Sequence, residues 1–329
     1  MKKYLITNVL ISITAVFFVL FCAEIIMRLS WKMGGWVNRP FYRRNFNPFL
    51  RYELIPGAKY ANVSINSDGF RGPEYSIPKP ANTFRIIMLG DSETLCFSLI
   101  QSDTLTVQLE NLLNQKPGSV HYEILNFGVE GYNIFQEMEM LKTKGLKYNP
   151  DLIILDYVLN DPEPGEYYFE KTFLIRHSAL MRYFSYRIKK SLIRKERRRL
   201  NIKTEVDNYY YYHSPKYLIP VKETMLEMAD IAARRANKLV VVIFSCSSIE
   251  VKDFKENYPY RKLHELIKNI NADNIIFVDL IDEFNRLNMT PQSVSIDYKI
   301  GESHKNAPAL KISAQYIYGI LKSNRVIPE

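Results

Sequence analysis

The feature that most constrains the fold is a series of short apolar runs that alternate with segments of helical periodicity. One run, Ile86 to Leu89, stops at Gly90-Asp91-Ser92, and another covers 151–158. Such runs, bounded by turn residues, indicate strands buried on both faces, as in parallel sheets. Helices between parallel strands imply right-handed crossovers and two outer helical layers. The pattern therefore predicts an α/β fold, a three-layer α/β/α sandwich around a five-stranded parallel sheet.

The expected elements follow one another along most of the chain. We expect strands at 84–90, 122–127, 151–158, 238–244 and 274–280. We expect helices at 104–113, 134–146, 221–236, 260–269 and 306–321. Together these elements assign 83–329 to one α/β domain, interrupted by a helical insertion at 162–217.

The first segment of the chain lies outside this domain and has the character of a membrane helix. From Tyr4 to Ile26 the sequence is almost entirely apolar, interrupted mainly by Asn8 and Glu24. That length suffices for the about 20 residues of a membrane-spanning helix. A cleaved signal peptide is the alternative, but Phe21-Cys22-Ala23 lacks the small residues that a cleavage site needs. We therefore expect an uncleaved signal anchor at 1–27.

The charges around this segment do not settle its orientation. Lys2 and Lys3 favour a cytoplasmic N-terminus, whereas the basic residues after the segment favour a cytoplasmic body. Those later basic residues are Arg28, Lys32, Arg39, Arg43 and Arg44. The formal net charge of +9 points to anionic partners, such as lipid surfaces or acidic polymers, and says nothing about the fold.

Two stretches carry no expected strand of the sheet. Residues 28–82 are rich in aromatic residues, Asn, Pro and Gly, and we expect a juxtamembrane lead-in with successive turns at 66–74. The insertion contains a basic helical segment at 182–199, which is either a solvated surface helix or a contact with anionic lipid or acidic glycan. Nucleic acid is not expected, because no recognition motif accompanies the charge. We expect the run at Tyr209–Tyr212 to pack onto the core rather than to line a sugar-binding surface.

The cysteine and glycine patterns argue against several cofactor classes. Cys22 lies in the apolar segment, and Cys96 and Cys246 form neither a disulfide framework nor a metal-binding spacing. Gly128 and Gly131 do not make a dinucleotide fingerprint, and no phosphate loop is present. We expect neither a metal nor a cofactor.

Polar and glycine residues gather where the expected strands end. The first strand ends at Gly90-Asp91-Ser92, the second leads into 126–133, and the third ends at Leu159-Asn160-Asp161. His304 lies just before the last expected helix, within 301–306. Because the carboxyl ends of parallel strands meet at one edge of a sheet, we expect these groups to come together there. A serine nucleophile needs such a set, a base together with donors for a developing oxyanion.

These four blocks, in this order, resemble those of the SGNH/GDSL hydrolase superfamily. The resemblance covers 84 to about 322, apart from the insertion. It implies a flavodoxin-like parallel sheet and activity on ester bonds. The stretch 66–74 also resembles a lead-in of membrane-anchored bacterial members associated with polysaccharide loci, which implies a body on the periplasmic side or the cell surface.

Carried over by position, the resemblance implies Ser92 as nucleophile and His304 as general base. It implies an oxyanion hole made by the backbone N–H of Ser92, the N–H of Gly131 and the side-chain amide of Asn160. The remaining histidines lie beside no such block and are expected to be structural: His121, His177, His213 and His264.

Two positions depart from the pattern of that superfamily. Leu159 stands where the third block usually has Gly, and we expect it to narrow the site. Gly301 stands three residues before the histidine, where the orienting acid usually lies. We take Glu302 as its replacement and keep Asp297 as the alternative acid. Without either, a serine–histidine dyad remains.

The sequence thus predicts a membrane-anchored serine esterase or O-acyltransferase that acts on acyl groups, with acetyl expected, of a cell-surface polysaccharide. The alternative is a catalytically decayed protein of the same fold that binds acidic glycan or assists polysaccharide assembly. Gly301 and the basic insertion favour that alternative. The residues that favour an enzyme are Ser92, Gly131, Asn160 and His304.

Overall fold

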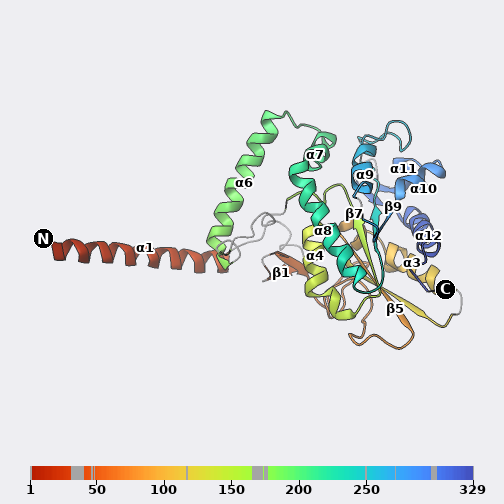
Figure 1. The fold of residues 1–329 in the computed structure, drawn as a ribbon, viewed down its shortest axis with the longest axis horizontal. Helices are drawn as coiled ribbons and strands as arrows, with labels where there is room; N and C mark the ends of the chain where they lie inside the picture. Colours follow the sequence, from red (N-terminus) through yellow and green to blue (C-terminus); the bar gives the residue numbers. More distant parts are fainter. Residues whose placement is uncertain are drawn as a thin grey trace.

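A computed structural model of the chain describes residues 2–30, 41–45, 47, 49–115, 118–164, 173, 177–248, 250–270, 272–297 and 302–328. For residues 2, 3, 29, 30, 302 and 303 it describes the backbone but not the side chains. Figure 1 shows a long N-terminal helix that projects from a body in which helices surround one central sheet.

The five strands of this sheet are all parallel, in the order β6-β5-β7-β8-β9. The chain forms β5 first, adds β6 on one side of it, and then crosses over to add β7, β8 and β9 on the other side. This reversal places a topological switch point at the carboxyl ends of β5 and β7, the edge where open α/β sheets bind ligands. The predicted α/β class and five-stranded parallel sheet are confirmed. The strands are β5 (Thr83–Gly90), β6 (His121–Gly128), β7 (Leu152–Tyr157), β8 (Leu239–Ile243) and β9 (Ile275–Asp279).

Helices cover both faces of the sheet, as Figure 1 shows. One face carries α4 (Ile134–Thr143) and α8 (Pro215–Ala233). The other face carries α3 (Leu105–Leu113), α9 (Arg261–Lys268), α10 (Leu280–Arg286) and α12 (Ala307–Ser323). Shorter helical turns are α2 (Ser92–Leu95), η2 (Gln101–Asp103), η3 (Gly145–Tyr148) and α11 (Pro291–Val294).

The core has two halves because successive side chains of a strand point to opposite faces. Ile87 and Leu89 of β5 are buried in the half that α4 and α8 complete. Ile86 and Met88 are buried in the half that α3 and α12 complete. These four side chains have an exposed fraction of 0%. Both faces of the strand are therefore dry, which explains why its sequence is an unbroken apolar run.

The lead-in packs into the first of these two core halves. It forms the antiparallel pairs β1 (Tyr42–Arg44) with β2 (Tyr52–Leu54), and β3 (Lys59–Tyr60) with β4 (Val63–Ser64). Phe41, Leu54 and Phe70 are buried in the same cluster as β5, α4 and α8. The described part of the lead-in, from residue 41 onward, therefore belongs to the packed core of the body.

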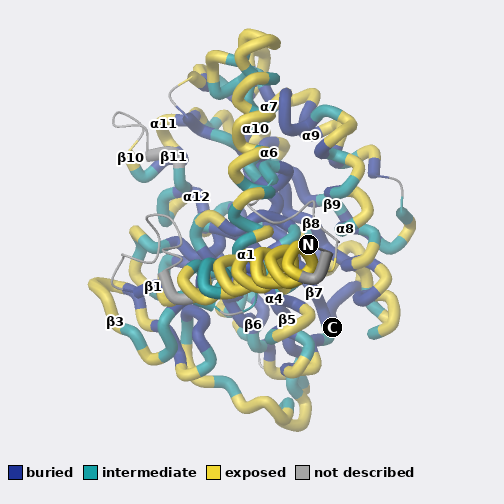
Figure 2. The backbone as a smooth tube through the Cα atoms, turned by 90° about the vertical axis from the view of Figure 1, so that its left-hand side faces the viewer, coloured by how far each residue is buried: buried dark blue, intermediate teal, exposed yellow. Residues whose placement is uncertain are grey.

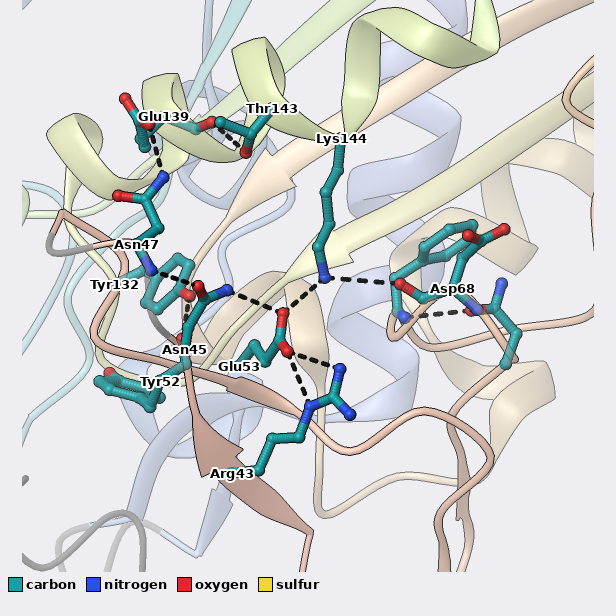
Figure 3. Close-up of polar contacts among 12 residues, drawn as sticks. Arg43, Asn45, Asn47, Tyr52, Glu53, Asp68, Tyr132, Glu139, Thr143 and Lys144 are labelled. Carbon is teal, nitrogen blue, oxygen red and sulfur yellow. Dashed lines mark hydrogen bonds and ion pairs between the residues drawn. The ribbon is translucent and has the colours of Figure 1, made fainter. Parts of the chain in front are cut away.

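Polar contacts also join the lead-in to α4, as Figure 3 shows. The Glu53 carboxylate accepts hydrogen bonds from Arg43 and from Lys144, the residue that ends α4, each at 2.7 Å. Burial alone would raise the pKa of Glu53, but these two cations hold that pKa below its ordinary value. The Asn47 amide donates to Glu139 of α4 at 2.7 Å. The lead-in is therefore held by charge-assisted contacts as well as by its apolar side chains.

The N-terminal helix and the insertion lie outside the sandwich. Helix α1 covers Lys2–Ser30, and its segment Tyr4–Arg28 contains an 18-residue window with a mean hydropathy of 2.7, long and apolar enough to cross a membrane. Figure 2 shows α1 exposed along most of its length. The insertion forms α6 (Ala179–Arg199) and α7 (Glu205–Tyr212), which lead into α8. Other parts of the insertion, at 165–172 and 174–176, are outside the described residues.

Some elements differ from those expected, and each difference has a local cause. Helix α8 begins ahead of the expected 221, because Ser214 and the proline at 215 form a helix start. The helix expected over 134–146 ends at Thr143, and the chain tightens into η3 from Gly145. The sequence did not predict α10, α11 or the hairpin of β10 (Ser295–Asp297) and β11 (Glu302–Lys305), which are all short.

One glycine in the sheet can be tested directly. A Cβ at Gly128, the last residue of β6, would lie 2.3 Å from the backbone nitrogen of Leu95 in α2. We expect Gly128→Ala to push α2 away and to lower the free energy of unfolding by about 1–3 kcal/mol. Denaturant unfolding of the full-length protein in detergent measures this change.

The matched control is Gly319→Ala in α12, where no atom lies within 4 Å of the added Cβ. Because alanine favours a helix over glycine, this change should raise the free energy of unfolding by about 0.5–1 kcal/mol. Equal stability of the two variants would contradict the close packing of β6 against α2.

Candidate active site

The turn that carries Ser92 follows directly from the end of β5. Asp91 caps α2, and its Oδ1 accepts a hydrogen bond from the backbone N–H of Glu93 at 2.9 Å. A Cβ at Gly90 would lie 2.0 Å from the Thr94 hydroxyl, so only glycine lets α2 lie this close to the strand end. The tight turn places Ser92 at the carboxyl edge of the sheet, half-buried.

His304 reaches this turn from the C-terminal hairpin. It lies on β11, which pairs with β10 in antiparallel fashion just before α12 begins at Ala307. Its Nε2 atom lies 2.8 Å from the Oγ atom of Ser92. This distance is that of a hydrogen bond between a hydroxyl and a histidine base. The two side chains are far apart in sequence and meet at the edge where the strands end.

The residues next to Ser92 and His304 form a second link between the same two segments. The Lys305 ammonium lies 3.2 Å from the Glu93 carboxylate, and the backbone N–H of Lys305 donates to that carboxylate at 3.1 Å. The Lys305 side chain is fully buried, and that of Glu93 is 11% exposed. An ion pair this buried is costly to break, because either partner alone would be an uncompensated charge. It therefore fixes the register of the histidine strand against the turn at 90–95, here called the nucleophile turn after the expected role of Ser92.

Of the expected oxyanion donors, Asn160 lies beside Ser92, whereas Gly131 lines neither of the cavities there. The Asn160 amide donates one hydrogen bond to Asp91 at 3.1 Å, which orients it beside the nucleophile turn. Asn160 lines a cavity together with Ser92 and His304. Gly131 is exposed, with a φ of +76° that favours glycine, and lies in the turn between β6 and α4. Its role as a donor stays a prediction.

The acid that would orient His304 also stays a prediction. Gly301 is outside the described residues, and for Glu302 only the backbone is described. Asp297 is exposed and lies opposite Glu302 in the β10–β11 pair. Both candidates thus stand on the hairpin that carries His304.

Two small cavities share Ser92, Glu93 and His304 as lining residues. The first has a volume of about 120 Å³ and extends toward the ends of β7 and β8, where it is lined by Val158, Leu159, Asn160, Tyr209, Phe244, Ser245 and Cys246. The second has a volume of about 90 Å³ and extends toward the loop after α2, where it is lined by Cys96, Phe97, Ser98, Leu99, Glu130, Ile296 and Lys305. Ser92 and His304 thus lie between two recesses.

The tyrosine run contributes to both the core and the site. Tyr211 and Tyr212 are buried and form a small cluster with Tyr217 of α8. Tyr209 packs edge-on against Tyr260 and lines the first cavity. The expected packing of the run is therefore found, but Tyr209 also faces the candidate site, which the sequence did not predict.

Arg71 of the lead-in holds the loop that follows Ser92, and the sequence did not single it out. Its side chain is fully buried, and its guanidinium donates to the carbonyl oxygens of Leu95 at 2.7 Å and Leu99 at 2.7 Å. It also donates to the carbonyl of Cys96, whose φ of 52° is unusual for a residue with a side chain. A planar fork of donors suits several carbonyls at once. The available signal was an arginine within the turn-rich stretch 66–74.

Four carboxyl groups are buried around the nucleophile turn, and no local sequence pattern predicts them as a set. They are Asp91, Glu137, Asp156 and Asp161. Burial raises the pKa of each, and their mutual proximity disfavours further negative charge. Within the described chain, neither oxygen of Glu137 has a hydrogen-bond partner. Burial without a partner therefore disfavours the charged form of the Glu137 carboxyl.

Two of the remaining histidines have structural partners, as expected. His213 contacts the Tyr157 hydroxyl at 2.9 Å, and burial lowers its pKa to about 4. His264 pairs with Asp279 at 2.9 Å and also contacts Tyr258. None of these groups lines either cavity. Over the described ranges, no cluster of three His, Cys, Asp or Glu side chains is arranged to bind a metal ion.

The Glu93–Lys305 pair generates a first prediction for the site. Lys305→Met should lower the free energy of unfolding by about 3–5 kcal/mol, because it leaves the Glu93 charge buried without its cation. The double variant Glu93→Gln/Lys305→Met removes both charges and should lose less than the sum of the two single variants. Denaturant unfolding of all four proteins measures the coupling.

The matched control is Lys216→Met, which removes one partner of the exposed pair Lys216–Glu196. That pair should contribute only about 0–1 kcal/mol. Strictly additive losses at Glu93 and Lys305 would contradict the proposed link.

Asp156 generates a prediction for pH dependence. Burial raises its pKa from 3.8 to about 8, while Thr94 donates to it at 2.5 Å. The folded protein therefore binds a proton that the unfolded chain loses near pH 4, so the free energy of unfolding falls as pH rises from about 4 to about 8. Asp156→Asn should flatten this fall, measured as melting temperature against pH. Asp273→Asn at an exposed position is the control, and an unchanged slope in Asp156→Asn would refute the assignment.

Comparison with known proteins finds distant likenesses among solved structures. No family model and no curated protein sequence matches the chain. Among solved structures, the acetyl xylan esterase AlAXEase is 14% identical, covering 72% of this chain and 100% of its own, with a TM-score of 0.45. The acetylxylan esterase Axe2 from Geobacillus stearothermophilus is 16% identical, covering 75% and 95%, with a TM-score of 0.44. A member of the lipolytic G-D-S-L family from Veillonella parvula is 14% identical, covering 73% and 98%, with a TM-score of 0.43. All three likenesses are distant, with identities of 16% or less and TM-scores of 0.45 or less.

Proposed function

We propose that this protein is a membrane-anchored serine esterase or O-acyltransferase that acts on acyl esters, most of all acetyl esters, of a cell-surface polysaccharide. Ser92 is the nucleophile and His304 the general base, and the reaction passes through an acyl-Ser92 intermediate. The observation that carries the proposal is the 2.8 Å contact between Nε2 of His304 and Oγ of Ser92. A nucleophile in hydrogen-bond reach of its base is the geometry that covalent acyl transfer requires.

In the first half of the reaction, Ser92 Oγ attacks the ester carbonyl carbon while His304 Nε2 takes the hydroxyl proton. Negative charge develops on the carbonyl oxygen, and the Asn160 amide and the backbone N–H of Ser92 are the donors that would stabilise it, with Gly131 as a third candidate. When the intermediate collapses, the bond to the leaving alcohol breaks and His304 returns the proton to that alcohol. The acyl group stays on Ser92.

In the second half, water or a sugar hydroxyl attacks the acyl-Ser92 carbonyl. His304 accepts the proton of the attacking group and returns it to Ser92 Oγ as the ester bond breaks. Attack by water gives hydrolysis, and attack by a sugar hydroxyl gives acyl transfer. The two outcomes differ in how well the site excludes water and orients the acceptor.

The small size of the cavities supports a short acyl group. The first cavity, at about 120 Å³, is well below the about 300–1,000 Å³ of sites for drug-sized ligands. Asn160 lines this recess, so a carbonyl oxygen bound at that amide would occupy part of it and leave room only for a short acyl group. Leu159, which stands in place of the usual glycine, lines the same recess and limits its size.

The packing of α1 supports an uncleaved anchor. Glu24 near the end of α1 accepts hydrogen bonds from the Ser178 hydroxyl at 2.7 Å and from the backbone N–H of Ala179 at 2.8 Å. A signal peptide that is removed would have no use for specific contacts with the mature chain. We place the body on the extracytoplasmic side, following the resemblance of its 66–74 stretch to anchored bacterial proteins.

A decayed, glycan-binding protein is the alternative. Gly301 in the usual position of the acid favours it. The contact between Ser92 and His304, and the buried pair beside it, favour catalysis, because a site without chemistry gains nothing from keeping this geometry.

Labelling with a fluorophosphonate tests the proposal. The full-length protein in detergent is treated with the reagent and digested, and the modified residue is identified by mass spectrometry. We expect a covalent adduct on Ser92 that is lost in His304→Ala and retained in Ser98→Ala, a control serine that lines the second cavity. No adduct on the folded wild-type chain would contradict the enzyme and favour the binding protein.

The same labelling assigns the acid. If Glu302 orients His304, Glu302→Gln should slow the labelling of Ser92 while Asp297→Asn leaves it unchanged. The reverse result would assign the role to Asp297, and unchanged labelling in both would leave the dyad.

A further inference from the structure

Helix α6 has an exposed apolar stripe, which is unusual for a helix of a folded body. Met181, Phe184, Ile188 and Leu192 are 42%, 52%, 59% and 60% exposed. Their spacing of three and four residues places all four on one side of the helix. An exposed contiguous apolar face of this kind indicates a surface that another phase or partner covers.

The same helix is strongly basic. Its only acidic residue, Glu196, accepts hydrogen bonds from Tyr211 at 2.9 Å and Lys216 at 2.7 Å, so it is engaged by the body. Arg187, Arg194 and Arg198 are exposed and follow one another at helical spacing beside the apolar stripe. The basic residues of α6 are Arg182, Arg187, Lys189, Lys190, Arg194, Lys195, Arg197, Arg198 and Arg199.

The opposite side of α6 is held by the body. Ile193 packs, together with Ile202, against the tyrosine cluster of α7 and α8. Figure 2, which views the molecule from the side on which α1 projects, shows α6 in front of the body with much of its length exposed. The free side of α6 therefore faces the side from which α1 extends.

The start of α6 is joined to the end of the apolar helix α1. Glu24 of α1 accepts hydrogen bonds from the backbone N–H groups of Ala179 and Leu180, at 2.8 Å and 2.9 Å, and so caps α6. Arg28 binds Glu24 at 2.7 Å and also donates to the carbonyl of His177. From this joint α6 runs across the direction of α1 rather than continuing it (Figure 1).

We propose that α6 lies flat in the interface of the membrane that α1 spans, with its apolar stripe among the upper acyl chains and its arginines on anionic lipid headgroups. A helix that crosses the direction of a spanning helix runs along the bilayer surface. Exposed apolar residues flanked by arginines are the composition of interfacial helices. Anionic headgroups supply the charge that the basic residues need. The proposal rests on the anchoring role of α1, and not on the chemistry of Ser92.

Quenching by brominated lipid tests where the stripe lies. Ile188→Trp is compared with Tyr186→Trp, which is two residues away and therefore on the other side of the helix. Full-length proteins are reconstituted into liposomes of phosphatidylglycerol and phosphatidylcholine that contain brominated acyl chains, and the signal of the wild-type tryptophans is subtracted. We expect strong quenching and a blue shift for Ile188→Trp and little of either for Tyr186→Trp. Equal quenching of the two would overturn the proposal.

The charge requirement is tested in the same assay. Combining Arg187→Gln, Arg194→Gln and Arg198→Gln with Ile188→Trp should reduce the quenching, and so should liposomes of phosphatidylcholine alone. Unchanged quenching in both cases would overturn the role of anionic lipid. If polygalacturonate in detergent protects α6 from trypsin and anionic liposomes do not, α6 is a glycan-binding surface and the membrane proposal fails.

Two controls separate this proposal from the others. Flotation of the liposomes after an alkaline wash reports the insertion of α1 alone. Fluorophosphonate labelling of Ser92 in the same samples reports the proposed chemistry alone. Failure of the α6 assay with both controls intact would refute only the position of α6.

Discussion

The ion pair between Glu93 and Lys305 is the interaction on which the candidate site depends. Glu93 directly follows Ser92, and Lys305 directly follows His304. The pair therefore joins the nucleophile turn to a hairpin that lies 212 residues later in the sequence. The hydrogen bond between a serine and a histidine contributes only about 1 kcal/mol net to stability. It therefore offsets little of the conformational entropy that is lost when such a long loop closes. A buried ion pair that costs much more to break can hold the hairpin in place. The proposed catalytic contact between Ser92 and His304 and the buried ion pair that holds it in place are thus made by neighbouring residues.

Buried polar groups around the nucleophile turn lower the free energy of unfolding of the protein. Asp91, Glu137, Asp156 and Asp161 are all buried there, where apolar residues would pack at lower cost. Arg71 is buried nearby and held by carbonyl oxygens of the loop after α2. Local departures from the rules of good packing are expected at functional sites. Their concentration at the edge where Ser92 lies agrees with a functional role for that edge.

Much of the fold could be predicted because its strands are buried on both faces. Each strand of the sheet then leaves an apolar run, as at Ile86 to Leu89, that needs no knowledge of its partners. The pairing of Ser92 with His304 was implied by the resemblance to SGNH/GDSL hydrolases, because His304 lies on a hairpin outside the parallel sheet. What could not be predicted depends on tertiary contacts without local pattern: the carbonyls that surround Arg71, the partner of Glu93, and the shared burial of four acids. The hairpin of β10 and β11 was missed because three- and four-residue strands carry too little periodicity.

The joint at Glu24 has a consequence for where a reaction could take place. Flexible tethers let an enzyme sweep a volume whose radius grows with the length of the linker. Here the apolar helix α1 is fastened to the body by side-chain and backbone hydrogen bonds near residue 178, so in the anchored protein that we propose the body has little freedom to tumble. The opening beside Ser92 would then keep a fixed distance from the bilayer surface and a fixed orientation relative to it. Such a protein meets its substrates by lateral diffusion, and only polymer segments that pass through a thin layer at that height come within reach. The distance of a polymer segment from the membrane would therefore limit binding before the shape of the site does.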